Sequence, residues 1–164
     1  MPTPTYDLIA SNVLGTATAT VTFSSIPATY RDLILVTTPI SASGTQYPTF
    51  RINGDTGSNY SWVVMSGTGS AAQSFTSSGT SANSTQNAGV GTSAGFIGIY
   101  QFLDYSATDK HKTILYRSNN PNIGAGTDAF AARWANTAAI NSIAFTASAN
   151  YAIGSTFYLY GIAS

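Results

Sequence analysis

The sequence contains no cysteine, no glutamate and only one histidine among its 164 residues. Without cysteine the chain has no disulfides, thiolate metal sites or cysteine nucleophiles, so its fold does not depend on the redox state of its surroundings. Charge is also scarce. Asp, Lys and Arg make up 7% of the residues, against about 25% in an ordinary domain, and the net charge is zero. Solubility must therefore come from serine, threonine and asparagine.

Low charge limits the kinds of partner that the chain can bind. Nucleic-acid binding needs clustered lysine and arginine, which displace counterions from phosphates, and a surface of hydroxyls and amides does not offer them. No apolar run approaches the length of a membrane span, and residues 1–5 lack the basic start and apolar stretch of a secretory signal. We therefore expect no nucleic acid and no membrane as partner, and synthesis in the cytoplasm. A low net charge also promotes association with other protein surfaces.

Groups that could perform catalysis are few. His111 lies between Lys110 and Lys112, where neighbouring positive charge disfavours its protonated form and nothing nearby in sequence would orient it; we interpret it as an exposed loop histidine. The six aspartates form no recognisable pair of the kind that glycosidases use. The loop at 53–57 lacks the ligand spacing and the closing carboxylate of a calcium site. We therefore predict no enzymatic activity, no metal and no cofactor.

Short apolar segments recur along the chain and show no helical period. The run Leu33-Ile34-Leu35-Val36 is typical of a strand that is buried on both faces. In residues 18–23 apolar and threonine side chains alternate, as in a half-buried antiparallel strand. About ten such strands predict an all-β fold, an antiparallel β-sandwich of jelly-roll type. The expected strands cover residues 6–10, 18–23, 33–36, 48–52, 60–65, 96–103, 113–117, 130–134, 142–146 and 156–162.

We expect a single sandwich domain over residues 6–164, preceded by an extended arm at residues 1–5 that contains Pro2 and Pro4. Asn53-Gly54 supplies the residues of a type I′ turn, so 48–52 and 60–65 are predicted to pair as a hairpin. Residues 67–93 are almost all Gly, Ser, Thr, Ala, Asn and Gln. We interpret this segment as a long irregular loop, anchored by its only aromatic residue, Phe75.

Aromatic residues are the one abundant resource, with ten tyrosines. Amphipathic rings fill cores and subunit interfaces, and they also form platforms for sugars. Because most of them lie in predicted strands, a core or interface role is favoured. Substitution of Trp62 or Tyr47 would test a sugar platform. The rings that could line one are Tyr47, Tyr60, Trp62, Tyr100, Tyr105, Tyr116, Tyr151, Tyr158 and Tyr160.

Four stretches of the sequence, taken in order, resemble a family of virion-surface proteins of tailed bacteriophages, cyanophages among them. Members occur as capsid decoration (cement) proteins and as modules of tail or head fibres. The similarity runs from about Tyr6 to Ile162, and its motifs are turns and core strands. The stretches are Phe23–Pro27 with Thr29–Tyr30 and Asp32–Leu33; Ile52–Gly54 with Asn59–Tyr60; Trp134 with Asn136–Ile140 and Ile143; and Gly154–Ser155 with Leu159–Ile162.

The resemblance implies a homotrimeric β-sandwich that binds the capsid exterior and holds neighbouring major capsid protein subunits together. The localisation that it implies is the outside of the virion capsid. We expect the partner interface to include Pro2, Pro4, Tyr6 and Phe75, with the arm lying along a neighbouring subunit. The alternative is a fibre module that binds a receptor or a carbohydrate, with the loops at 67–93 and 119–126 as its contact surface.

Overall fold

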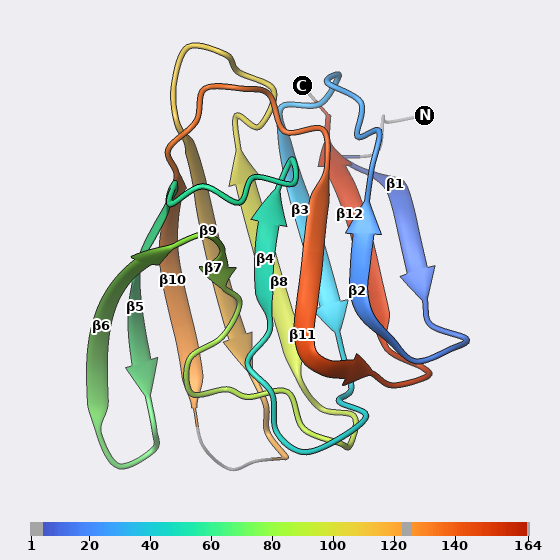
Figure 1. Cartoon of the computed structure of the whole chain (residues 1–164), viewed down its shortest axis with the longest axis vertical. Coiled ribbons are helices and arrows are strands. Elements are labelled where there is room, and N and C mark those ends of the chain that lie inside the picture. The colour runs from blue at the N-terminus through green and yellow to red at the C-terminus, as the bar shows by residue number, and fades with distance from the viewer. Residues whose placement is uncertain (1–4, 123–125, 164) are drawn as a thin grey trace.

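The computed structural model describes residues 5–122 and 126–163. They form two stacked antiparallel sheets (Figure 1). The large sheet has eight strands in the order β1-β12-β3-β8-β9-β10-β5-β6, and the small sheet has four in the order β2-β11-β4-β7. The strands are β1 (Tyr6–Val13), β2 (Thr18–Phe23), β3 (Asp32–Thr38), β4 (Thr49–Ile52), β5 (Tyr60–Gly67), β6 (Ala72–Gly79), β7 (Ala82–Asn83), β8 (Ile97–Leu103), β9 (Lys112–Asn119), β10 (Thr127–Trp134), β11 (Ile143–Tyr151) and β12 (Thr156–Ile162). The predicted antiparallel β-sandwich is confirmed.

Aromatic rings fill the space between the two sheets. Phe50 of the small sheet is fully buried and lies against Tyr100, Phe102 and Tyr116 of the large sheet, with ring centroids 5.6 to 6.1 Å apart in edge-to-face arrangements. Its neighbour within the small sheet, Phe145, stacks on it at 5.4 Å. Such pairs add about 0.5–1.5 kcal/mol each beyond the area that they bury. The aromatic residues in strands therefore serve mainly to join the layers.

Strand β3 matches the prediction of a strand with two apolar faces. Leu33 and Leu35 are fully buried on the inner side of the large sheet. Ile34 is only 8% exposed although it points to the outer side, and Val36 beside it is half-buried. The neighbours β12 and β8 pair with β3 along most of its length. The inner face of β3 is covered by the small sheet, whereas its outer face is shielded only by side chains of the neighbouring strands of the same sheet.

The hairpin predicted at Asn53-Gly54 is wrong in its pairing. Both residues have positive φ, 52° and 66°, so the turn itself forms. However, β4 pairs with β11 and β7 in the small sheet, whereas β5 pairs with β10 and β6 in the large one. Residues 53–59 therefore carry the chain from one layer to the other. The dipeptide specifies the local turn, but it does not determine which strand becomes the neighbour.

The segment 67–93 is not one irregular loop. Residues 72–79 form β6, which pairs with β5 over its whole length, and residues 82–83 form β7. Seven of the eight β6 residues are exposed, so backbone pairing holds this strand and not the burial of an apolar face. Phe75 lies opposite Val64 and is 40% exposed. It is a residue of an edge strand and does not anchor a loop.

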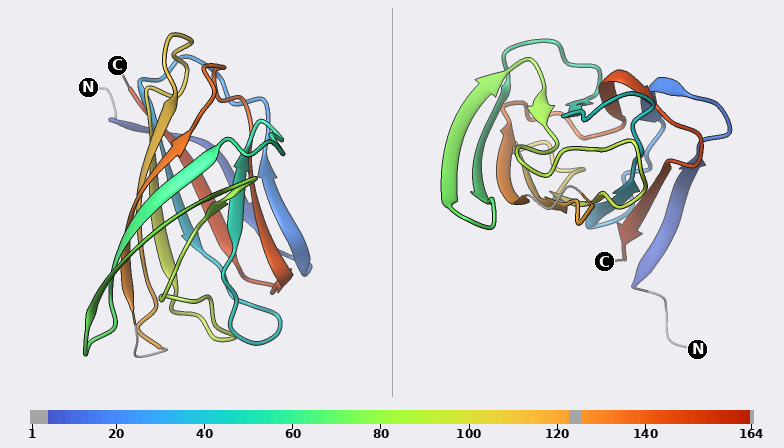
Figure 2. Two further views of the ribbon diagram at one scale, coloured as in Figure 1. Left: turned by 60° about the vertical axis from the view of Figure 1, so that its left-hand side comes forward. Right: turned by 90° about the horizontal axis from the view of Figure 1, so that it is seen from below.

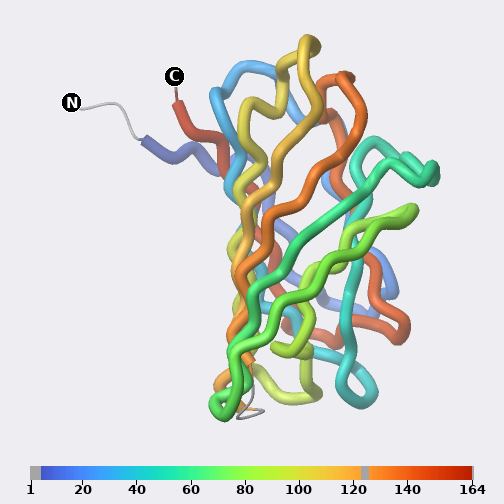
Figure 3. Tube along the Cα trace, turned by 90° about the vertical axis from the view of Figure 1, so that its left-hand side faces the viewer, coloured from blue at the N-terminus to red at the C-terminus, as the bar shows by residue number. Residues whose placement is uncertain are grey.

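The large sheet is wider than the small one and curves at its ends. In Figure 1 the small sheet lies in front of one part of the large sheet, while β5 and β6 extend beyond it on the left. The view from below in Figure 2 shows the curvature, with β1 and β6 at the two ends. Figure 3 shows the two layers edge-on, with β5 and β6 crossing in front.

Candidate functional site: an apolar sheet face

The outer side of the large sheet carries apolar side chains where a solvated sheet face would carry polar ones. In β5, Trp62 and Val64 are buried in the core, while Val63 and Met65 point outward and are 48% and 66% exposed. In β9, Leu115 points outward in the same way and is 38% exposed. These strands thus have two apolar faces, only one of which packs against the small sheet.

Strand register aligns the outward-facing residues into two rows that run across the sheet. Residues directly opposite each other on paired strands share a face and lie side by side. We call these two rows the apolar face. The first row is Met65, Ala129, Arg117, Ile99, Val36 and Tyr158, and the second is Val63, Ala131, Leu115, Gln101, Ile34 and Tyr160.

The apolar face is concave. Its side chains line a groove of about 830 Å³, and Tyr6 of the edge strand β1 also lines this groove. Leu8 lies opposite Tyr160 and extends the second row onto β1. Leu8 and Tyr6 are 55% and 57% exposed. Contiguous exposed apolar surface on this scale marks a binding surface more often than a chance cluster.

Two polar side chains interrupt the rows. Arg117 lies between Ala129 and Ile99, and Gln101 lies between Leu115 and Ile34. Within residues 5–122 and 126–163, the ion pairs are Arg31 with Asp32 and Lys110 with Asp104, so no carboxylate of that part of the chain neutralises Arg117. A partner on this face would meet an apolar surface with one cation and one amide.

Polar residues limit the apolar face on three of the strands. On one side the next outward-facing row contains Ser61, Arg133, Thr113 and Leu103, and on the other it contains Gly67, Thr127, Asn119 and Ile97, which is 43% exposed. The apolar region is therefore bounded by polar residues on β5, β10 and β9 and continues to both ends of β8. A polar rim around an apolar centre is the usual anatomy of a protein interface.

Beneath one end of this sheet, Asp128 of β10 is fully buried and holds a loop in place. Its carboxylate accepts hydrogen bonds from Thr85 Oγ1 at 2.9 Å, from the backbone N–H of Gln86 at 2.8 Å and of Ala88 at 3.0 Å, and from Ser66 Oγ. Burial alone would raise the pKa of Asp128, but these donors outweigh it and lower the pKa. The loop after β7 is thus attached to the large sheet through a buried charge.

A second polar cluster connects the layers where the chain crosses between them. Asp55 accepts hydrogen bonds from Asn59 Nδ2 at 2.8 Å, Trp134 Nε1 at 2.7 Å and the Gly57 backbone at 2.8 Å, and these lower the pKa of its carboxyl. Asn53 donates to the carbonyl of Ala139 at 2.7 Å and accepts from the backbone of residues 141 and 142. Asn53 and Asn59 belong to the second of the four stretches described above, and Trp134 and Ala139 to the third, and here they form structural contacts.

The first and fourth of those stretches also meet. A Cβ built on Gly161 would lie 2.3 to 2.5 Å from the ring of Tyr30, so only glycine allows this ring to pack on β12. The hydroxyl of Tyr105 donates to the carbonyl of Pro27 and accepts from the backbone N–H of Tyr30 at 3.3 Å. The motifs therefore hold the sandwich together in pairs, far apart in sequence but adjacent in space.

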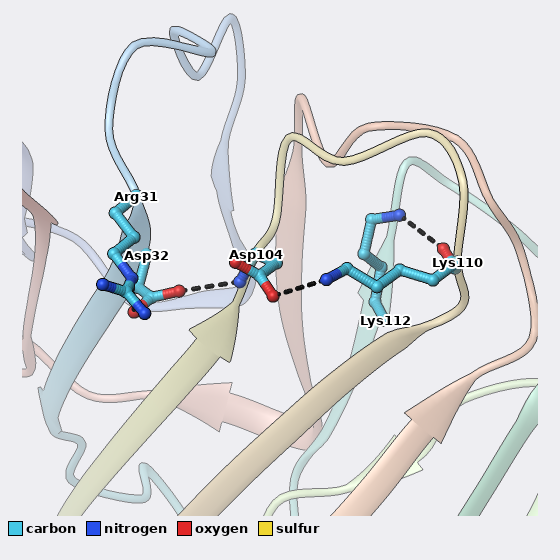
Figure 4. Close-up of polar contacts among 5 residues, drawn as sticks. All are labelled: Arg31, Asp32, Asp104, Lys110 and Lys112. Carbon is cyan, nitrogen blue, oxygen red and sulfur yellow. Dashed lines mark hydrogen bonds and ion pairs between the residues drawn. The ribbon is translucent and has the colours of Figure 1, made fainter. Parts of the chain in front are cut away.

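Charged residues gather at the end of the large sheet that carries the β8–β9 hairpin (Figure 4). The backbone N–H of Asp104 donates to Asp32 Oδ1 at 2.7 Å, and Lys110 Nζ lies 2.7 Å from Asp104 Oδ2. The hydrogen bond to Lys110 lowers the pKa of Asp104, and Asp104 raises the pKa of Lys110. Lys112 is buried and donates to the carbonyls of Lys110 and Thr137 at 3.0 and 3.1 Å; burial lowers its pKa. This end of the molecule is an ordered polar cap on the hairpin.

The predicted interface residues are not brought together. Tyr6 lines the groove, whereas Phe75 lies on the inner side of β6, the side opposite the apolar face. Pro2 and Pro4 lie outside the described residues. Of the rings that could line a sugar platform, Tyr47 is 53% exposed and Trp62 is a core residue that is 8% exposed, while Tyr158 and Tyr160 lie on the apolar face. His111 is exposed on the β8–β9 hairpin, as expected.

Arg117, Gln101, Asp128 and the apolar face are features that sequence reasoning missed. One signal of the face was present: residues 60–65 and 113–117 carry apolar side chains at both odd and even positions, as β3 does. That pattern predicts burial on two sides, and one side of each strand has no cover in the isolated chain. Nothing in the sequence around Asp128 identifies it, because its donors come mostly from residues about forty positions earlier.

No family model matches this sequence, and no curated protein matches it. Among solved structures, the galectin LEC-6 of Caenorhabditis elegans is similar with a TM-score of 0.36 and 14% identity, over 98% of this chain and 96% of that one. Within the described part of the chain, no helix is long and apolar enough to cross a membrane. In the same residues, no three His, Cys, Asp or Glu side chains gather as a metal site.

Proposed function

We propose that this chain is a capsid decoration (cement) protein of a tailed bacteriophage, which assembles as a homotrimer on the outside of the capsid and stabilises the lattice of the major capsid protein. The observation that carries the proposal is the apolar face, a surface suited to association with protein. The sequence resemblance to phage virion-surface proteins supplies the setting. The scarcity of charge fits a non-enzymatic role in assembly.

In the proposed mechanism the protein acts on the capsid only by binding to it. A protein that binds an assembled lattice and not its separated subunits stabilises the lattice by mass action. A standard protein interface buries about 1,600 Å² in total, and apolar burial contributes about 25 cal/mol per Å² before the costs of association are subtracted. The aromatic core and the polar clusters at Asp55 and Asp128 keep the sandwich rigid, which reduces the entropy lost on binding.

The experiment uses purified expanded capsids that lack the protein. We expect saturable, stoichiometric binding, and a higher temperature of capsid disruption when the protein is bound. An unrelated sandwich protein of similar size and charge serves as the control. Capsids that neither bind the protein nor gain thermal resistance would contradict the proposal.

A carbohydrate-binding or receptor-binding fibre module is the second candidate. The observation that favours it is the groove itself, which combines the rings of Tyr6 and Tyr160 with Arg117 and Gln101. Ligand sites commonly pair an apolar lining with a few polar groups that orient the ligand. If the chain is such a module, it should bind host cell-wall glycans, and Tyr160→Ala should weaken this binding. Tyr47→Ala tests whether an exposed tyrosine outside the groove contributes. The absence of binding to host cells and glycans would count against it.

A further inference from the structure

The apolar face has no cover in the single chain, and its composition is that of an interior surface. We infer that the same face of a second copy of this chain covers it, sheet against sheet. This inference rests on the proposed function, because it names the partner of the face that carries that proposal. It leaves the capsid to be contacted by other surfaces of the assembly.

The outer side of the large sheet is large enough for a stable interface between copies. Eight strands about 4.8 Å apart span about 38 Å, and seven or eight residues per strand at about 3.3 Å extend about 25 Å. The whole outer side, which is the apolar face together with the residues that surround it, therefore measures about 950 Å², close to the 800 Å² or so that each partner contributes to a standard interface. A small sugar would cover only part of this area and would leave most of the apolar rows in water.

Charge also favours a second copy over a partner of another chemistry. Arg117 is the only charged residue in the two rows, so two faces can meet with little repulsion. A partner that presented an acidic patch would find one cation to match and would lose the hydration of its other carboxylates. A second copy instead brings the amide of Gln101 and the hydroxyls of Tyr158 and Tyr160, which are neutral acceptors for a guanidinium.

The two rows offer a packing that keeps the cations apart. When two identical faces meet about a twofold axis that runs between the rows, each row lies against the other row of its partner. Arg117 then faces Leu115 of the second copy and not the second Arg117, with its apolar stem buried and its head free to reach acceptors. A threefold arrangement would have a different register, because each face would then meet two neighbours through unlike parts of its surface.

The experiment measures self-association of the full chain by analytical ultracentrifugation across a range of concentrations, with two matched pairs of variants. Leu115→Lys and Met65→Lys place a charge on the apolar face. Phe75→Lys and Ile153→Lys place it elsewhere at matched exposures, 40% against 38% for Leu115 and 64% against 66% for Met65. Thermal unfolding of all four variants checks that each is folded.

We expect the wild type, Phe75→Lys and Ile153→Lys to form the same complex, and the face variants to associate at least about a hundredfold more weakly, because an unpaired charge would be buried. The mass of the complex reports whether two or three copies take part. A wild type that stays monomeric at every concentration would overturn the inference. So would a complex that survives Leu115→Lys and Met65→Lys combined, or one that only Phe75→Lys dissociates.

The capsid assay distinguishes this inference from the proposed function. A wild type that self-associates through the face but ignores capsids would refute the capsid role and leave the inference standing. A protein that decorates capsids while its self-association is unaffected by Leu115→Lys would refute the inference alone. A third outcome is that the wild type is a monomer that binds glycans and that Leu115→Lys abolishes this binding. The apolar face would then be a sugar site, and both the inference and the capsid role would be refuted.

Discussion

The outer face of the small sheet is built from threonine, whereas the outer face of the large sheet is built from Val, Ile, Leu, Met and Tyr. In the small sheet Thr20, Thr146 and Thr49 lie side by side in one row, and Thr20 Oγ1 and Thr146 Oγ1 are 3.2 Å apart within hydrogen-bond distance. The inner faces of both sheets are mainly apolar, although that of the large sheet also holds the buried side chains of Lys112 and Asp128. The outer sides of the two sheets, in contrast, differ in kind.

This contrast shows that the chain can build a water-facing sheet whose strands contain a single charged residue, Arg51. Threonine keeps the high β-propensity of a branched side chain while adding a hydroxyl that water can bind. The apolar residues of the large sheet are thus not a consequence of low overall charge, because the same composition gives a hydrated face on the small sheet. An interior-like surface on one layer only points to a partner for that layer.

The largest effect on stability is expected from Asp128→Ala. This variant tests whether the buried contacts of Asp128 stabilise the large sheet in the absence of a partner. The substitution leaves the donors of Thr85, Gln86 and Ala88 buried without an acceptor, so we expect a loss of about 3–5 kcal/mol in the free energy of unfolding. Chemical denaturation measures it. Asp109→Ala, at an exposed turn, is the control and should stay within about 0.5 kcal/mol of the wild type. A loss below about 1 kcal/mol for Asp128→Ala would contradict the structural role.

The next effect comes from making the large sheet resemble the small one. The triple variant Val63→Thr, Met65→Thr and Leu115→Thr keeps β-propensity and removes apolar surface from the face. We expect self-association to weaken at least about tenfold and the free energy of unfolding of the monomer to change by less than about 1 kcal/mol. Ultracentrifugation and denaturation measure the two quantities. Unchanged association would mean that the contrast between the faces has no role in assembly.

The converse change makes the small sheet resemble the large one. Thr20→Val, Thr49→Val and Thr146→Val together replace a row of hydroxyls by methyl groups of nearly the same shape. We expect weak new self-association, about tenfold above that of a matched variant in which Thr68, on the exposed β5–β6 turn, becomes Val. Sedimentation velocity at rising concentration detects it. The triple variant is also made together with Leu115→Lys, which prevents association through the apolar face. If that protein is fully monomeric, apolar side chains on a sheet are not sufficient for self-association.

The fold class follows from local patterns, and the arrangement of the strands does not. Alternation in residues 18–23 and the run at 33–36 specify strands because burial on a pleated sheet imposes a period of two. Strand β6 was not predicted, because it consists largely of Ser and Thr and buries almost no apolar surface. Its backbone pairing with β5 stabilises it instead. The Asn53-Gly54 turn formed, but the polar contacts of Asn53 to residues 139, 141 and 142 direct the chain to the other layer.

The candidate site was less predictable than the fold. Single residues such as Ile34 and Leu115 are unremarkable in sequence, and they form a surface only when strand register places them in one row. Register depends on turns and on long-range pairing, which a local pattern does not encode. Tyr6, taken from the start of the first strand, does lie at the groove, whereas Phe75 points to the other side of the sheet.

The smallest expected effect is a decrease in the free energy of unfolding at acid pH. This effect distinguishes the two sheets, because their carboxylates lie in different places. Asp55 and Asp128 have lowered pKa values, whereas the strands of the small sheet contain no aspartate. A carboxylate whose pKa is lower in the folded state stabilises the fold above its unfolded value, here 3.8, and this stability is lost as the pH falls through the folded value.

We therefore expect the free energy of unfolding to be flat from neutral pH down to about pH 5 and to decrease below about pH 4. Amide hydrogen exchange should report the loss first at Gln86 and Ala88, which donate to Asp128, and not at Phe145 in the centre of the small sheet. In Asp55→Asn combined with Asp128→Asn this acid dependence should decrease to the part that Asp104 contributes, which is small because its ion pair with Lys110 is exposed to solvent. An equally steep decrease in that double variant would place the acid-sensitive contacts elsewhere, and the difference between the sheets would then lie in their outer faces alone.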